Sequence, residues 1–190
     1  PLPASGLPAQ PDGFEGGWGG WLVDYIGGSA TDFGIWEIGV PASGPGAAHS
    51  GTNCAATVLA GNHPENRSAR LVSPAFTVPE ADQLPRLRFW HWWSYDCGDY
   101  GRVEIKVGTG DWQALSDSIG ASSDGQWSRA WLDLTPYAGK EVRLGFYNYA
   151  NTACFQGYAP GWYIDEVTVE TGPLPASGLP AQPDGFEGGW

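Results

Sequence analysis

The histidine, serine and acidic residues are the first candidates for chemistry. The chain holds three histidines, His49, His63 and His91, and His49 is followed by Ser50. A hydrolase needs a nucleophile, a base and an orienting acid brought together, and local sequence patterns often mark such sites. The sequence contains no nucleophile elbow, no HExxH and no CxxC. His63 precedes Pro64 in a predicted turn, so we expect it to be exposed. We predict that the chain is not an enzyme.

The segment Leu87–Tyr95 (LRFWHWWSY) is the richest candidate for ligand binding. Side chains alternate along a strand, so its aromatic residues divide between two faces: Phe89, His91, Trp93 and Tyr95 on one, Trp90 and Trp92 on the other. One face must belong to the core. The other is a sugar-stacking platform, an interface or a surface covered by a loop. Tyr147 and Tyr149, in another predicted strand, present the same choice.

Three cysteines, Cys54, Cys97 and Cys154, form no CxxC pair. This spacing argues against a zinc site or a thioredoxin-like motif. The cysteines form either one disulfide and one free thiol, as in an oxidising compartment, or three buried reduced thiols. A glycosylation sequon, Asn66-Arg67-Ser68, matters only if the host glycosylates.

The charge of the chain limits its partners. Asp and Glu number 21 against 9 Lys and Arg, which gives a formal net charge of -12. Such a surface repels phosphate backbones and anionic membranes, so we expect no nucleic-acid binding. No run of apolar residues is long enough to cross a bilayer, so we expect no membrane insertion. The balance suits divalent cations and neutral ligands such as glycans.

A repeated segment determines the predicted domain organisation. The sequence PLPASGLPAQPDGFEGGW occupies Pro1–Trp18 and recurs without change at Pro173–Trp190. A recurrence at domain-length spacing is typical of tandem modules, with artefactual duplication of one end as the alternative. We predict a Pro-rich linker over residues 1–13, a domain over 14–171, a second linker over 172–185 and the next repeat from 186 to 190. Proline-rich linkers are extended and semi-rigid.

Strand signals dominate the domain. Short apolar runs alternate with clusters of Gly, Pro, Asn and Asp, and no segment keeps a helical period over twelve residues. In Arg102–Val107 (RVEIKV), period-two alternation places Val103, Ile105 and Val107 on one face. Leu134–Gly139 is one expected short turn of helix. The pattern predicts an all-β jelly-roll sandwich of about ten antiparallel strands.

A family resemblance rests on short motifs that occur in a fixed order. They include Phe14-Glu15, Trp36-Glu37-Ile38-Gly39, Gly44-Pro45, Ala48-His49-Ser50-Gly51, Leu71-Val72-Ser73-Pro74, Asp99-Tyr100-Gly101-Arg102 and Gly161-Trp162-Tyr163-Ile164-Asp165. The chain resembles the MAM-like jelly-roll superfamily, whose bacterial members include cleaved-adhesin domains and sandwich modules that trail secreted metalloproteases. The resemblance implies an extracellular setting and adhesion or carbohydrate contact, without catalysis.

The resemblance also implies a structural calcium ion between the first and last strands. The matching acids are Glu15 and Asp165, and the polar Ser50–Asn53 turn, Asn53 included, adds oxygen ligands. Ala48 stands where MAM domains often have an Asp, which removes one ligand of the family pattern. In the resembled fold, the loops of Cys97 and Cys154 lie toward the same end, which implies a disulfide and leaves Cys54 buried and inert.

Three functions follow, in order of preference. The first is a structural repeat of an extracellular filament or giant surface adhesin, with identical modules as partners. The second is a carbohydrate-binding module of a secreted protein, and the third is a hydrolase. If Phe14–Trp18 is an edge strand, its copy, Phe186, Glu187 and Trp190 included, is an inter-repeat strand that adds to the next module or to a neighbouring chain.

Overall fold

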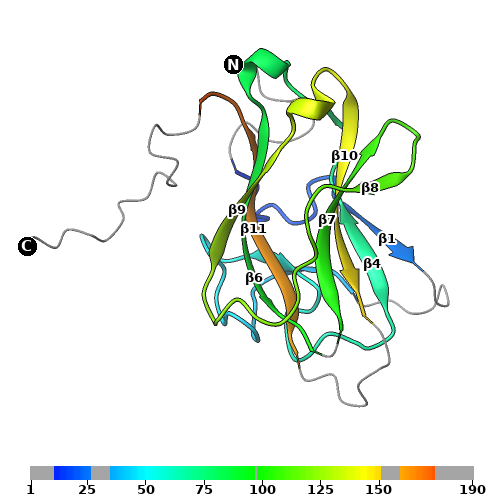
Figure 1. Cartoon of the computed structure of the whole chain (residues 1–190). Helices are drawn as coiled ribbons and strands as arrows, with labels where there is room; N and C mark the ends of the chain where they lie inside the picture. Colours follow the sequence, from blue (N-terminus) through cyan, green and yellow to red (C-terminus); the bar gives the residue numbers. More distant parts are fainter. Residues whose placement is uncertain (1–10, 27–34, 97, 151–158, 174–190) are drawn as a thin grey trace, which may run out of the picture.

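A computed structural model describes residues 11–26, 35–96, 98–150 and 159–173. Two antiparallel sheets pack face to face in it (Figure 1). The strands are β1 (Leu22–Ile26), β2 (Glu37–Gly39), β3 (Cys54–Ala56), β4 (Ser68–Val72), β5 (Phe76–Thr77), β6 (Arg86–Ser94), β7 (Tyr100–Val107), β8 (Trp112–Ala114), β9 (Ser128–Asp133), β10 (Glu141–Tyr149) and β11 (Gly161–Glu170). Two 3-10 helices, η1 (Ala81–Gln83) and η2 (Thr135–Tyr137), complete the described elements.

The order of the strands is that of a jelly roll. The six-stranded sheet runs β1-β4-β10-β7-β8, with β5 also paired to β10, and the five-stranded sheet runs β2-β3-β11-β6-β9. Both central strands, β10 and β11, come late in the chain and pair with strands from its first half. The predicted fold class is confirmed. The predicted strand Arg102–Val107 lies within β7, Leu87–Tyr95 overlaps β6, and η2 lies within the predicted helical turn Leu134–Gly139.

The core lies between the two sheets and is dominated by aromatic rings. The rings of Phe14, Trp21, Phe146 and Trp162 follow one another, with centroids 5.5 to 6.0 Å apart. Val103 and Ile105 are buried and Val107 packs against the same cluster, so the alternation predicted for β7 is confirmed. Each fully buried aromatic side chain of this kind contributes about 1.5–3 kcal/mol through removal of apolar surface from water.

The first described residues belong to the sandwich. Asp12 exchanges backbone hydrogen bonds with Val167 of β11, and its carboxylate accepts hydrogen bonds from Phe14 N (3.0 Å) and Trp21 Nε1 (2.9 Å). Phe14 is completely buried, with a left-handed backbone (φ 59). The residues after it form turns, and the first strand begins only at Leu22. The condition set for strand exchange, an edge strand at Phe14–Trp18, is therefore not met, because Phe14 is buried in the core and turns follow it.

His63 also differs from its prediction. It is buried, with 2% of its surface exposed, because its backbone amide donates to the carbonyl of Ala159 (3.0 Å) and its ring packs edge-on against Tyr95. Burial lowers the pKa of the imidazole, and the carboxylate of Asp99, 3.5 Å from Nε2, acts in the opposite direction. The His63-Pro64 pair predicted a turn, but it could not predict that the segment ahead of β11 covers His63.

Candidate functional site

In the aromatic segment Leu87–Tyr95, most of which forms β6, the structure shows which rings lie in the core and which lie on the surface. Tyr95 is buried in the main core, and its hydroxyl donates to Asn148 Oδ1 at 2.8 Å. Trp93 packs against the same core. Trp92 lies on the opposite face of the sheet but is buried against Tyr163 in a second apolar cluster. Trp92 and Tyr95 are therefore not available to stack on a ligand.

Trp90 is the aromatic residue of β6 that stays half-exposed on the outer face of the five-stranded sheet. Its ring stacks on His49 with centroids 3.8 Å apart and 15° between the planes, and the guanidinium of Arg129 lies 5.8 Å above it. His49 Nδ1 also lies 3.0 Å from the carboxylate of Glu166. His49 is thus held as a packing partner of Trp90 and an ion-pair partner of Glu166.

A larger aromatic surface lies on the outer face of the six-stranded sheet. We call it the Tyr–Arg face, and it consists of Arg70 (β4), Tyr100, Arg102 and Glu104 (β7), Trp112 (β8), and Tyr147 and Tyr149 (β10). These residues alternate with core residues such as Leu71, Val103 and Phe146, so their side chains point away from the core. Strands β4, β7 and β10, which are distant in the sequence, meet here, and β8 lies beside β7.

Cross-strand pairing places the rings and guanidinium groups of the Tyr–Arg face in register. Tyr100 and Tyr149 are direct partners, and their rings stack with centroids 4.9 Å apart. Tyr147 lies between Arg70 and Arg102, whose guanidinium carbons are 4.9 and 5.5 Å from its ring centroid. Such cation–π contacts hold the rings in fixed orientations.

Glu104 anchors the centre of the Tyr–Arg face. Its carboxylate is almost completely buried, pairs with Arg70 Nε at 2.5 Å and forms a second ion pair with Arg102. The hydrogen bond that Arg102 donates to Glu104 is the main cause of the raised pKa of Arg102. A buried carboxylate between two guanidinium groups fixes their positions without occupying all of their donors.

Trp112 reaches across this surface because Gly145 leaves space for it. A Cβ atom at position 145 would lie 2.8 Å from the indole ring of Trp112 and 3.3 Å from Arg70 Cδ. Beside Trp112 is a hollow of about 440 Å³, also lined by Lys106 and Arg143 of neighbouring strands and by Asp24. Within the described part of the chain, neither Lys106 nor Arg143 pairs with a carboxylate. The hollow therefore carries positive charge in a strongly acidic protein.

The sequence pointed to this face only in part. Tyr147 and Tyr149 were left open between core and ligand contact. Both point to the outer face of the sheet, where Tyr149 is partly exposed and Tyr147 is buried beside Arg70 and Arg102. Tyr100, Arg70, Arg102, Glu104 and Trp112 were missed. Period-two alternation places Arg102 and Glu104 on the face of the strand away from Val103, and that signal was present in the sequence. The sequence did not show which strands pair with this one.

The predicted calcium residues come together around one turn. Asp165 Oδ2 accepts a hydrogen bond from Ser50 N at 3.0 Å, and Glu15 Oε1 accepts from Thr52 N and Asn53 N, both at 2.8 Å. The side chain of Asn53 donates to the carbonyl of Phe14 at 3.4 Å, which leaves its own amide oxygen for another partner. The two acids thus hold opposite ends of the Ser50–Asn53 turn.

A β-bulge in β11 places Asp165 in this position. The pairing of β11 with β6 shifts between Asp165 and Thr168, and Glu166 takes a left-handed conformation (φ 51). Bulges re-aim side chains near functional sites. Here the side chain of Asp165 points to the Ser50–Asn53 turn and is completely buried, while that of Glu166 points toward His49.

Asp165 lacks a compensating cation among the described residues. No Lys or Arg of that part of the chain pairs with Asp165 or Glu15. Burial raises the pKa of Asp165 to about 7, although the backbone amides of Ser50 and Glu166 act in the opposite direction. Burial, with the nearby charges of Asp165 and Glu15, also raises the pKa of the Cys54 thiol to about 12, so Cys54 is buried and protonated.

The Ser50–Asn53 turn offers two carboxylates and one amide oxygen as candidate ligands of a hard cation. Among the described residues, no three His, Cys, Asp or Glu side chains gather as a metal-binding group. A calcium ion at this turn would therefore depend on Asp165 and Glu15 together with amide and carbonyl oxygens, which calcium accepts readily. An unbalanced buried carboxylate beside such oxygens is the feature that favours a cation here.

The remaining predicted sites are placed as follows. Asn66 is exposed in the turn ahead of β4. Cys97, Cys154, Phe186, Glu187 and Trp190 lie outside the described residues. No described helix is long and apolar enough to cross a membrane.

Comparison with solved structures identifies the fold. The structure is similar to TmCBM61, solved in complex with β-1,4-galactotriose (TM-score 0.55, 15% identity, 85% of this chain and 95% of that one). It is equally similar to the K1 cleaved adhesin domain of Lys-gingipain from Porphyromonas gingivalis W83 (TM-score 0.54, 20% identity, 90% and 95%). The chain shares its jelly-roll fold with both of these domains. The jelly-roll fold that the resemblance implied is thereby confirmed.

Sequence comparison relates this jelly roll to part of a larger protein. It is 33% identical over 159 residues to Bacillopeptidase F of Bacillus subtilis (strain 168), a match that covers 82% of this chain and 10% of that protein. The chain thus spans about a tenth of the length of this relative. No protein-family model matches the chain.

Proposed function

We propose that this jelly roll is a non-catalytic, extracellular module that binds glycans on the Tyr–Arg face. The observation that carries the proposal is the arrangement of half-exposed rings and anchored guanidinium groups on one open sheet surface. Sugar rings offer apolar C–H faces for stacking and hydroxyl groups for hydrogen bonds. Tyr100, Tyr149 and Trp112 supply the first kind of contact, and Arg70 and Arg102 supply the second.

Pre-organisation supports this assignment. Tyr147 and Glu104 hold both arginines before any ligand arrives, so little side-chain entropy remains to be lost on binding. Fixed aromatic and polar groups of this kind are typical of small-molecule sites. The fold shared with TmCBM61, which was solved with a galactotriose, agrees with a sugar ligand.

The hollow beside Trp112 refines the ligand class. Lys106 and Arg143 are direct cross-strand partners, and both line the hollow. Two adjacent cations without carboxylate partners would attract the carboxylates of an acidic polysaccharide. We therefore favour a glycan that contains uronic acid units over a wholly neutral one.

A binding measurement tests the proposal directly. Calorimetric titration of the chain with galactan and polygalacturonate oligosaccharides should detect binding, and Tyr149→Ala and Tyr100→Ala should each weaken it by at least tenfold. Tyr25→Ala provides the control, because Tyr25 is 49% exposed on β1 and pairs with Ala69, a core-facing position outside the Tyr–Arg face. Equal losses in all three variants, or no binding to any glycan in an array, would reject the proposed function.

We propose that calcium stabilises the module at the Ser50–Asn53 turn. The residues that would hold it are Asp165, Glu15 and Asn53. The support is the buried carboxylate of Asp165, which pairs with no Lys or Arg of the described residues, and its place beside Glu15 on the same turn. The ion would compensate the negative charge of Asp165 and Glu15. The backbone pairing of Asp12 with Val167 would keep the first described residues in place beside β11.

A second candidate role is a unit of a tandem array. In the first copy of the repeated segment, Asp12 pairs with Val167 and Phe14 fills the core. The second copy has the same residues at Asp184 and Phe186. Those residues are suited to begin a further module of the same kind. Electron microscopy of the native protein should then show regularly spaced globular units, and an isolated unit would contradict the array.

A further inference from the structure

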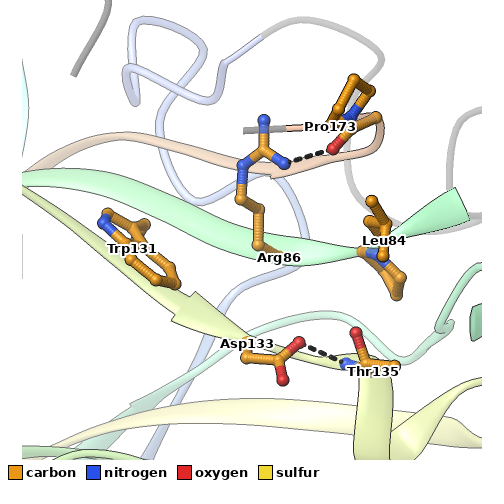
Figure 2. A pocket seen from close by; sticks show the side chains of 8 residues that line it. Leu84, Arg86, Trp131, Asp133, Thr135 and Pro173 are labelled. Atoms are coloured by element: carbon orange, nitrogen blue, oxygen red, sulfur yellow. Dashed lines mark hydrogen bonds between the residues drawn. The ribbon is translucent and has the colours of Figure 1, made fainter. Parts of the chain in front are cut away.

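A second hollow lies at the end of the sandwich where β11 finishes. It has a volume of about 420 Å³, and its walls come from Leu84 and Pro85 ahead of β6, from Arg86 at the start of β6, from Trp131 and Asp133 of β9, and from Gly172 and Pro173 (Figure 2). Ligand pockets generally fall between about 300 and 1,000 Å³. The hollow is far from the Tyr–Arg face in the fold, because it belongs to the other sheet.

Two of the largest exposed apolar side chains of the described residues meet in this hollow. Trp131 is 55% exposed and Leu84 is 47% exposed. Leu84 has a left-handed backbone (φ 52), which is an unfavourable conformation for a bulky residue. Its amide closes η1 by donating to the carbonyl of Ala81 at 3.1 Å. The backbone is thus strained at Leu84, whose apolar side chain lines the hollow.

The polar groups of the hollow are already satisfied. Asp133 accepts a hydrogen bond from Thr135 N at 2.9 Å, and Arg86 donates to the carbonyl of Gly172 at 2.7 Å (Figure 2). The amide of Gly172 donates in turn to the carbonyl of Gln83 at 2.7 Å. What remains available to a partner is the apolar surface of Trp131, Leu84 and Pro85. These contacts also fix the point at which the chain leaves the sandwich.

We propose that this hollow, which we call the Trp131 pocket, is a docking site for the chain's own proline-rich segment, residues 174–180. Pro173 already forms part of the pocket wall, and the sequence continues from it as Leu174-Pro175-Ala176. The pocket and the segment are therefore covalently adjacent, so docking requires no encounter between separate molecules and a high effective concentration favours it.

The chemistry of the segment matches that of the pocket. Residues 174–180 contain two prolines, two leucines and no charged residue. Proline-rich chains populate the polyproline II conformation, which loses little entropy on binding, and aromatic-lined grooves recognise them. The ring of Trp131 and the side chains of Leu84 and Pro85 form such a groove. A docked segment would give the linker a fixed exit direction, and any module joined through it would be held at a defined angle.

Nuclear magnetic resonance of the whole chain tests the proposal. In the wild type, backbone amides of Leu174 and Ala176 should show order parameters near those of the strands, about 0.85, and nuclear Overhauser contacts should join the Trp131 ring to Leu174 or Pro175. In Trp131→Ala, the order parameters of these amides should fall below about 0.6 while those of β7 stay unchanged. Trp131→Phe should keep an intermediate value, and Tyr25→Ala should have no effect.

Three outcomes would overturn the proposal. The first is a low order parameter for the amides of Leu174 and Ala176 already in the wild type. The second is an equal order parameter for these amides in wild type and Trp131→Ala. The third is a dependence of the Trp131 contacts on protein concentration, which would assign the pocket to a segment of a second copy. Leu84→Ser provides an independent variant if Trp131→Ala lowers the folded population, and it should release the segment in the same way.

Discussion

The carboxylate of Asp165 accepts a hydrogen bond from the backbone amide of Ser50, although the two residues are 115 positions apart in the chain. The contact joins the last strand to the turn that also binds Glu15. It connects the bulge in β11 with the beginning of the domain. Because Asp165 is fully buried, the contact makes the stability of this end of the sandwich depend on the charge of one group.

The first prediction concerns calcium. Addition of calcium at pH 7.5 should raise the melting temperature, since a ligand that binds only the native state stabilises it by about 2.7 kcal/mol at a concentration a hundred times the dissociation constant. Differential scanning calorimetry with calcium and with chelator measures the shift. Asp165→Asn should lose the response, and Asp24→Asn, at an exposed acid of the other sheet, should keep it. A wild-type melting curve that is the same in chelator and in calcium would reject the site.

The second prediction concerns pH in the absence of calcium. Burial raises the pKa of Asp165 to about 7 from an ordinary value of 3.8, so the native state keeps a proton that the unfolded chain has already lost. Stability due to this group is fully present below about pH 4 and is lost as the pH rises toward 7, on the order of 1.4 kcal/mol per unit of pKa difference. Urea unfolding should show that the difference in unfolding free energy between wild type and Asp165→Asn falls as the pH rises across this range, because both proteins share the opposing contribution of His63. A difference that stays constant across this range would assign the pH dependence to other groups.

The third prediction concerns Glu104. Glu104→Gln removes the charge between Arg70 and Arg102 and should reduce the free energy of unfolding by about 3 kcal/mol, near the lower end for a broken buried ion pair. It should also weaken glycan binding, because the two guanidinium groups lose their common anchor. Equilibrium unfolding and calorimetric titration measure both effects.

Glu170 provides a matched control for Glu104. Its carboxylate also bridges two arginines, Arg86 and Arg88, but its side chain is 29% exposed. Exposed ion pairs contribute about 0–1 kcal/mol, so Glu170→Gln should change stability little. Equal losses of unfolding free energy in the two variants would mean that the burial of Glu104 does not make its ion pairs stronger than the exposed pairs of Glu170.

The fourth prediction concerns the charge of the hollow beside Trp112. Lys106→Gln should reduce the affinity for polygalacturonate oligosaccharides about three- to tenfold and leave binding to neutral galactan unchanged, because one charge-assisted contact is lost. Added salt should weaken the wild-type interaction with the acidic glycan by screening, and should have less effect in the variant. A similar loss for both glycans would show that Lys106 acts through packing instead of charge.

The sequence predicted where the strands lie better than it predicted which side chains share a surface. Alternation along Arg102–Val107 correctly placed Val103 and Ile105 in the core, because a period of two is a local property of a strand. The two-residue strand Phe76–Thr77 escaped prediction because it is too short to show a period. The prediction for His63 was wrong because its burial comes from Ala159 and Tyr95, neither of which is near it in the sequence.

By itself, the sequence determined the all-β class, the inward residues of the long strands, the acidic surface and the repeat at Pro1–Trp18 and Pro173–Trp190. These properties depend on composition and local spacing. Only the tertiary structure decided which outward residues share a surface, because strand order depends on long-range pairing that leaves no local periodic signal. That pairing sets Arg70 and Arg102 on either side of Tyr147, and it brings Ser50 to Asp165.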